Sequence, residues 1–219
     1  MLKAILFDMD GVLINSTKYI WESFNVMLKE SGVHLSDKDV EKSLGLSMRD
    51  KLKVWREDYG IKEYDTEEFS REAGKIEIEL MEKEFHPNKA LNNLLNEAKE
   101  NQIKLAVATL SLRWRAEKIL KLLKIKDKFE VIVTGNDVEN HKPHPDVFLK
   151  ATKLLNVNPE DCIVFEDAPI GIEAAKRGNI KIVAIETEFF PKEELKDFDL
   201  IIRDFSEINL ERLKCLFEK

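Results

Sequence analysis

The sequence predicts an α/β protein, built on a parallel sheet that an all-α segment interrupts. Beyond residue 86, short apolar runs alternate with helical periodicity, which is typical of a parallel sheet covered on both faces. One more strand-like run stands near the N-terminus, at residues 4–7, and is assigned to the same sheet. The stretch between them shows only helical periodicity. We therefore predict a core domain of residues 1–16 plus 86–219 and an inserted helical domain of residues 17–85.

The individual elements follow from the spacing of apolar residues. Short apolar, β-branched runs predict the remaining strands at 104–108, 130–134, 162–165, 181–185 and 199–202. Apolar residues three to four positions apart predict the helices between them at 90–100, 113–123, 145–155 and 170–177. The same spacing in the insertion predicts helices at 19–31, 37–44, 48–59 and 66–84. The predicted helix boundaries are Gly32, Gly45 and Gly60, with Ser36 and Ser47 as N-caps.

Length and charge narrow the functional class. A chain of 219 residues suits one domain with an insertion. Its formal net charge of -7 gives no attraction to nucleic acid or to an anionic membrane, and no apolar run approaches the ~20 residues of a membrane span. Two cysteines outside any metal-ligand spacing, and no secretory signal pattern, favour a reducing compartment. We expect a cytoplasmic monomer that binds neither nucleic acid nor membrane.

Chemically active residues follow four of the predicted strands. Because the carboxyl ends of parallel strands meet at one edge of a sheet, we expect these residues to converge on a single crevice. The four sets, in chain order, are Asp8 with Asp10, Thr109, Lys142, and Glu166 with Asp167.

This combination suits a phosphoryl group bound beside a Mg²⁺ ion. Carboxylates are the hard oxygen ligands that Mg²⁺ favours, and the metal neutralises phosphate charge so that a carboxylate can attack it. A lysine ammonium, a threonine hydroxyl and backbone N–H groups bind the phosphate oxygens. Asp10 can give a proton to the leaving oxygen and then take one from water. We predict Met9, Gly11 and Leu110 as further phosphate-binding positions, with Gly11 letting the backbone pass close to the phosphate.

Each feature alone has a structural explanation. An Asp-x-Asp-Gly sequence can be a strand-ending turn, and Glu166-Asp167 can cap the helix that follows it. Thr109 alone would be structural, and Lys142 alone would be a surface lysine. Four such features in order, each at a strand end, favour a site.

The motifs resemble those of the haloacid dehalogenase-like hydrolases. They are Phe-Asp8-Met-Asp10-Gly-Val, then Thr109, then Lys142-Pro-His-Pro-Asp146, then Glu166-Asp167-x-x-x-Gly171-Ile-x-Ala-Ala. The chain is most similar to the branch with a small helical cap, which includes β-phosphoglucomutase, phosphoglycolate phosphatase and many sugar-phosphate phosphatases. The resemblance covers the whole chain and implies a Rossmann-like core with a helical cap domain that opens to admit substrate and closes to exclude water.

The resemblance also implies a role for each motif residue. Asp8 would be the nucleophile that forms an aspartyl-phosphate, and Asp10 the general acid and base. Thr109 and Lys142 would hold the phosphate. The implied Mg²⁺ ligands are Asp8, the carbonyl of Asp10 and Asp167. Glu166 would either bind the metal directly or stand behind the residues that do.

The chain departs from its relatives at some positions. Leu110 stands where relatives often have Asn or Ser, so no side-chain phosphate contact is expected there, and Ser111 or Arg113 could replace it. Arg49, at a predicted turn of the cap, could meet an anionic substrate group or could be a solvated helix-start residue. Ile20 stands where β-phosphoglucomutase has a histidine that restrains the acid/base aspartate.

These observations predict a Mg²⁺-dependent phosphatase acting on a small phosphomonoester, a sugar phosphate or similar metabolite. The alternative is a phosphohexose mutase like β-phosphoglucomutase, which must protect its aspartyl-phosphate from water. Ile20 favours hydrolysis. A true dehalogenase lacks the second aspartate and needs no metal, so Asp10 and Asp167 count against it.

Overall fold

The computed structural model describes all residues except Leu44, Gly45, Ser47, Phe85 and Lys219. Four predictions lie outside the described residues. They are the helix boundary at Gly45, the N-cap at Ser47, the end of a helix at residue 44 and the end of the helical domain at residue 85. The chain divides into two compact units, one formed by Met1–Asn15 with His86–Lys219 and the other by Ser16–Phe85.

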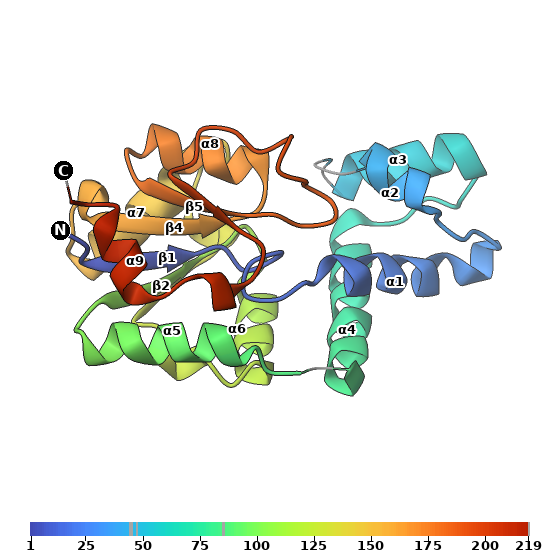
Figure 1. The fold of residues 1–219 in the computed structure, drawn as a ribbon. Helices are drawn as coiled ribbons and strands as arrows, with labels where there is room; N and C mark the ends of the chain where they lie inside the picture. The colour runs from blue at the N-terminus through green and yellow to red at the C-terminus, as the bar shows by residue number, and fades with distance from the viewer. Residues whose placement is uncertain (44–45, 47, 85, 219) are drawn as a thin grey trace. The chain divides into compact units, whose positions relative to one another are not determined.

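The first unit is built on a six-stranded parallel sheet, which confirms the predicted α/β fold class (Figure 1). The strand order is β3-β2-β1-β4-β5-β6, so the N-terminal strand β1 lies in the centre, between β2 and β4. The strands are β1 (Ala4–Phe7), β2 (Lys104–Ala108), β3 (Val131–Val133), β4 (Cys162–Glu166), β5 (Lys181–Ile185) and β6 (Leu200–Ile202).

Helices cover both faces of this sheet. On one face, α7 (Asp146–Leu155) and α8 (Pro169–Arg177) pack on small side chains of the strands, including Ala4, Ala106 and Val164. The other side carries α5 (Lys89–Glu100), α6 (Arg113–Leu122) and α9 (Leu210–Cys215) (Figure 1). Because the central strands are buried on both faces, they are continuously apolar rather than alternating.

A cluster of three phenylalanines packs the central strands together at the edge where the predicted site residues begin. Phe7 of β1 and Phe165 of β4 lie in register, with ring centroids 5.0 Å apart, and Phe205 packs 5.3 Å from Phe165. Phe7 precedes Asp8 and Phe165 precedes Glu166. The aromatic packing therefore positions the two carboxylates that follow these strands.

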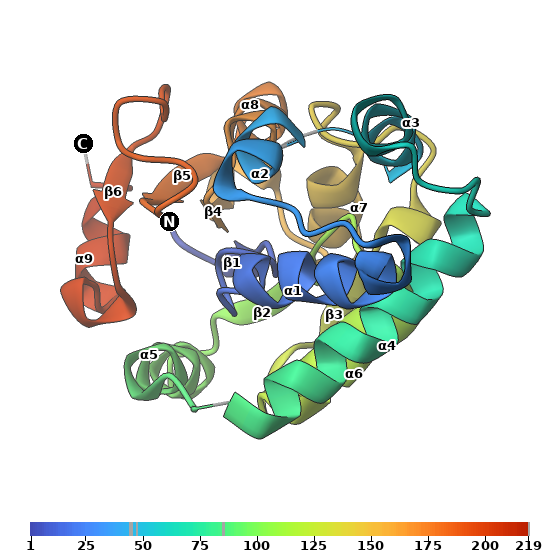
Figure 2. The same cartoon turned by 90° about the vertical axis from the view of Figure 1, so that its right-hand side faces the viewer.

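The second unit contains only helices in its described residues: α1 (Thr17–Leu28), η1 (Lys29–Ser31), α2 (Asp37–Ser43), α3 (Met48–Tyr59) and α4 (Thr66–Glu84). Helices α1 and α4 pack against each other, as Figure 2 shows. Trp55 is fully buried among Trp21, Phe24 and Phe69. No described helix of either unit is long and apolar enough to cross a bilayer.

Several predicted boundaries differ from the structure by one or more residues, and two of the differences have a local cause. The predicted helix 19–31 ends as an α-helix at Leu28 and continues as one 3-10 turn, η1, which stops at Gly32 with a left-handed φ of 70°. The predicted strand 130–134 is shortened because Thr134 leaves the sheet to form a capping box with Asp137, at the start of the 3-10 turn η3 (Gly135–Asp137).

Removing the ring of Phe165 should test how much this aromatic cluster stabilises the unit that contains the sheet. We expect Phe165→Ala to lower the free energy of unfolding by about 3–5 kcal/mol, because it leaves a cavity beside Phe7 and Phe205. The measurement is urea denaturation followed by circular dichroism. Leu154→Ala is the matched control, because Leu154 is 57% exposed on α7 and should change stability by less than about 0.5 kcal/mol. Equal losses in both variants would contradict this account.

Candidate active site

The turn after β1 brings its two aspartates to the edge of the sheet. The N–H of Asp8 donates to the carbonyl of Phe165 (3.0 Å), which extends the pairing of β1 with β4 by one residue. The carbonyl of Met9 accepts from Leu13 (2.9 Å), so the chain turns sharply after Asp8. Gly11 has a φ of 78°, and a Cβ atom there would lie 1.9 Å from Oδ2 of Asp167. Only glycine leaves room for the Asp167 carboxylate.

Lys142 connects the first and last predicted motifs. Its Nζ donates to Oδ1 of Asp8 (2.6 Å) and to Oε2 of Glu166 (2.7 Å). All three side chains are buried, with exposed fractions of 5% for Lys142, 9% for Asp8 and 2% for Glu166. A buried charge is tolerated only when it is paired and hydrogen-bonded, and here one cation serves two anions.

The remaining charge in this cluster is negative. Burial raises the pKa of Asp8 to about 7 although Lys142 acts to lower it, and Glu166 and Asp10 raise it further. Burial, Glu166 and Asp8 also raise the pKa of Asp167 well above its usual value. The pKa of Lys142 is raised, because its two carboxylate partners outweigh its burial. Further positive charge would therefore stabilise the ionised form of these acids.

The geometry fits a metal ion in this position. One carboxylate oxygen from each of Asp8, Glu166 and Asp167 lies within 4.8 Å of the others. Oxygen ligands of this kind suit Mg²⁺, which would supply the missing positive charge and polarise a bound phosphate. The predicted contact through the Asp10 carbonyl stays a prediction.

Thr109 and Leu110 lie where the second predicted motif places them, at the end of β2. Thr109 is 1% exposed; its N–H donates to the carbonyl of Val133 (3.0 Å), and its hydroxyl accepts from the N–H of Ser111 (3.1 Å). A Cβ atom at Gly135 would lie 2.6 Å from the carbonyl oxygen of Leu110. The loop after β3 therefore passes directly against the Leu110 peptide.

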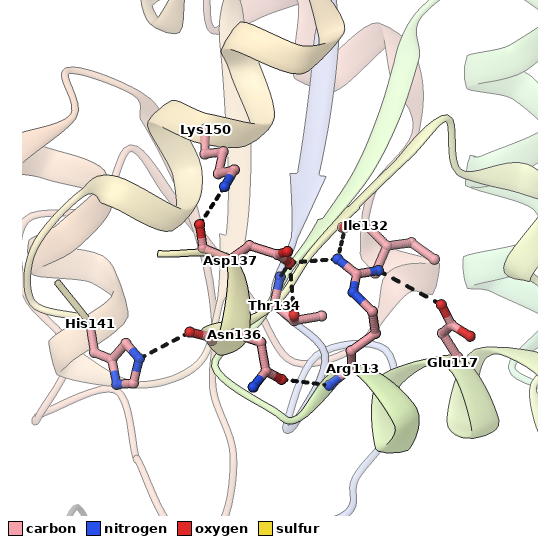
Figure 3. Close-up of polar contacts among 9 residues, drawn as sticks. Arg113, Glu117, Ile132, Thr134, Asn136, Asp137, His141 and Lys150 are labelled. Atoms are coloured by element: carbon pink, nitrogen blue, oxygen red, sulfur yellow. Dashed lines mark hydrogen bonds and ion pairs between the residues drawn. The ribbon is translucent and has the colours of Figure 1, made fainter. Parts of the chain in front are cut away.

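A polar network joins the loop after β2 to the loop after β3 (Figure 3). The guanidinium of Arg113 donates to the carbonyl of Ile132 (3.1 Å) and to Oδ2 of Asp137 (2.5 Å). The side chain of Asn136 in turn accepts from the N–H of Arg113 (3.1 Å). Lys150 donates to the carbonyl of Asp137, and His141 contacts that of Gly135. The segment that leads to Lys142 is thus fastened to the start of α6.

Ser111 and Arg113 were considered as possible phosphate ligands, but in the structure both bind protein side chains. Arg113 is paired with Asp137, and Ser111 donates to Oδ2 of Asp10 (2.8 Å). Asp10 also forms a two-pronged ion pair with Arg115, a residue that the sequence reasoning did not identify. The signal available in the sequence was an arginine four positions after Ser111.

The other predicted site residues lie in different settings. Met9 is fully buried in the turn beside Asp8, so a phosphate contact there would use its backbone. Arg49 is exposed in the first turn of α3, in the helical unit. Its predicted contact with substrate stays a prediction.

Comparison with known proteins decides the family. The family model described as haloacid dehalogenase-like hydrolase matches residues 5–185, which include all four motifs. This chain belongs to that family. The predicted resemblance is confirmed, and so is the predicted enzyme class, a haloacid dehalogenase-like phosphoric monoester hydrolase.

The relatives of this haloacid dehalogenase-like hydrolase include phosphatases and mutases. It is 31% identical to phosphorylated carbohydrates phosphatase of Thermotoga maritima, over 82% of this chain and 83% of that protein. It is 34% identical to glycerol-1-phosphate phosphohydrolase 1 of Saccharomyces cerevisiae, over 95% of this chain and 85% of that protein. The crystal structure of β-phosphoglucomutase from Clostridium difficile has a TM-score of 0.82, with 28% identity over 99% of this chain and 97% of that one.

The raised pKa values predict how pH and metal affect stability. The folded state holds protons on Asp8 and Asp167 to a higher pH than the unfolded chain, so metal-free stability should fall as pH rises from about 4 to about 7. Added Mg²⁺ should therefore raise the melting temperature more at about pH 8 than at about pH 5. Differential scanning calorimetry measures both effects.

Asp167→Asn supplies the matched control for this prediction. Without metal, this variant should be more stable than the wild type at about pH 8, because it removes a destabilising charge. It should gain less stability from Mg²⁺. A metal-free variant that is less stable than the wild type at that pH would contradict the electrostatic account.

Gly171, in the first turn of α8, makes room for Glu166. A Cβ atom there would lie 2.0 Å from the carboxyl carbon of Glu166. We expect Gly171→Ala to displace this carboxylate and to lower catalytic efficiency about 10²-fold, as misplaced site groups do. Steady-state phosphate release measures it. The control is Gly178→Ala, at the glycine that ends α8. A Cβ atom there would come no closer than 3.3 Å to other atoms. Similar activity losses in both variants would count against the proposed crowding of Glu166.

Proposed function

We propose that this hydrolase is a Mg²⁺-dependent phosphatase of small phosphomonoesters that works through an aspartyl-phosphate on Asp8. One observation carries the proposal. At the end of β1, the Asp8 carboxylate accepts a hydrogen bond from buried Lys142. One of its oxygens also lies within 4.8 Å of a carboxylate oxygen of Glu166 and one of Asp167. A nucleophile, a cation for phosphate and a metal-ligand set therefore occupy one position.

The reaction has two halves in this proposal. An oxygen of Asp8 attacks the phosphorus while Lys142 and Thr109 hold the phosphate oxygens, and Asp10 gives a proton to the leaving alcohol. Water then attacks the aspartyl-phosphate, Asp10 takes its proton, and Asp8 is released as a carboxylate. Bound Mg²⁺ would neutralise phosphate charge beside Asp8, Asp167 and Glu166.

Small phosphorylated carbohydrates are the substrate class we propose. The names of two relatives point to it, a phosphorylated carbohydrates phosphatase and a glycerol-1-phosphate phosphohydrolase. We extend this substrate class to the present chain. The monomeric state and cytoplasmic location stay predictions.

Mutase activity is the second candidate, since β-phosphoglucomutases are among the relatives. A mutase returns the phosphoryl group to a sugar, whereas a phosphatase releases it to water. The sequence reason for favouring hydrolysis is unchanged: Ile20 on α1 carries no group that could hydrogen-bond to an acid/base carboxylate. Incubation with a hexose 1-phosphate and a trace of hexose bisphosphate separates the two, because a mutase forms the 6-phosphate with little free phosphate.

Asp8→Asn tests the proposed mechanism. We expect Mg²⁺-dependent phosphate release from 4-nitrophenyl phosphate by the wild type and a loss of at least about 10³-fold in the variant, because an amide cannot serve as the nucleophile. Glu173→Gln is the control, since Glu173 is an exposed ion-pair residue on α8 and its replacement should leave activity unchanged. Full activity in Asp8→Asn, or wild-type activity that does not respond to Mg²⁺ or chelator, would refute the proposal.

A further inference from the structure

The carboxylate of Asp10 is held by two side chains of its own unit, Arg115 and Ser111. Arg115, in the first turn of α6, donates from Nη2 to Oδ1 (2.7 Å) and from Nη1 to Oδ2 (2.8 Å). The hydroxyl of Ser111 donates to Oδ2 as well (2.8 Å). The side chain of Arg115 is 11% exposed and that of Asp10 is 31% exposed. Both carboxylate oxygens thus accept hydrogen bonds from groups of the β2–α6 segment.

This arrangement fixes an orientation. A guanidinium that binds both oxygens of a carboxylate fixes the plane of the carboxylate as well as its position, which a single lysine contact does not. Arg115 is itself steadied, because its Nη1 also donates to the Ser111 hydroxyl (2.5 Å). The helix that carries it is anchored at Arg113 by Asp137 and Asn136. The position of Asp10 therefore depends on α6 as well as on its own turn.

The geometry of the pair bears on the second half of the proposed reaction. Proton transfer from the attacking water needs an Asp10 carboxylate held in a defined plane, and the two hydrogen bonds from Arg115 fix that plane.

We propose that Arg115 is a positioning residue for Asp10, orienting its carboxylate to take the proton of the attacking water. This inference rests on the proposed aspartyl-phosphate mechanism. In the step concerned, the water oxygen forms a bond to phosphorus and the bond from phosphorus to the Asp8 oxygen breaks. The electron pair of that bond returns to Asp8, and the water proton passes to Asp10.

The test is rapid mixing of 4-nitrophenyl phosphate and Mg²⁺ with the full-length wild type, Arg115→Met and Arg115→Lys. The leaving oxygen of this substrate is a weak base, so the first half needs little help from Asp10. Arg115→Met should therefore slow only the breakdown of the aspartyl-phosphate. We expect kcat and KM to fall together by about tenfold or more, kcat/KM to stay within about threefold, and a burst of 4-nitrophenol to appear.

Three further variants sharpen the result. Arg115→Lys, which keeps the charge but not the two-pronged geometry, should recover part of kcat, and Ser111→Ala should show a weaker form of the same pattern. Arg177→Met removes the arginine of an exposed ion pair on α8 and should leave both constants unchanged. If Arg115→Met fails to fold, Arg115→Lys and Ser111→Ala still carry the test.

The outcomes separate this inference from the proposed function. A fall in kcat/KM as large as that in kcat, with no burst, would overturn the role of Arg115 while leaving an active phosphatase. A wild type that forms no aspartyl-phosphate would overturn the proposed function, and this inference with it.

Discussion

The buried interaction of Lys142 with Asp8 and Glu166 is the constraint around which the core unit is organised. Two carboxylates reach the same point because β1 and β4 are neighbours in register at the centre of the sheet. Water cannot stabilise them there, so the lysine that follows β3 must reach across from its own loop. The charge that remains is negative, and this surplus makes the site a place for a cation.

Fold and site are joined through the loops at the strand ends. The Arg113–Asp137 ion pair fastens the loop that leads to Lys142 to the start of α6, and the first turn of that helix places Arg115 at Asp10. The lysine proposed to bind phosphate and the aspartate proposed to move protons therefore both depend on the start of α6. A disturbance of α6 would reach both.

The sequence was sufficient for the fold class and for the meeting of Asp8, Lys142, Glu166 and Asp167. Strand ends of a parallel sheet converge whatever their loops do, so the order of motifs along the chain predicted this edge. The ion pair of Asp10 with Arg115 could not be predicted in the same way. It depends on where the β2–α6 loop turns and on which way a long side chain points from a helix, and neither leaves a periodic pattern. The contact of Leu110 with the loop after β3 could not be predicted either, because it is made by the Leu110 peptide and not by its side chain.

Gly11 and Gly171 have a consequence for how such a chain can change over time. Each occupies the space that an acid needs, Asp167 in one case and Glu166 in the other. A single methyl group at either position would compete for space with that carboxylate, which supplies the nearest atoms. A single substitution at Gly171 could therefore weaken catalysis in a descendant while the parallel sheet stays intact.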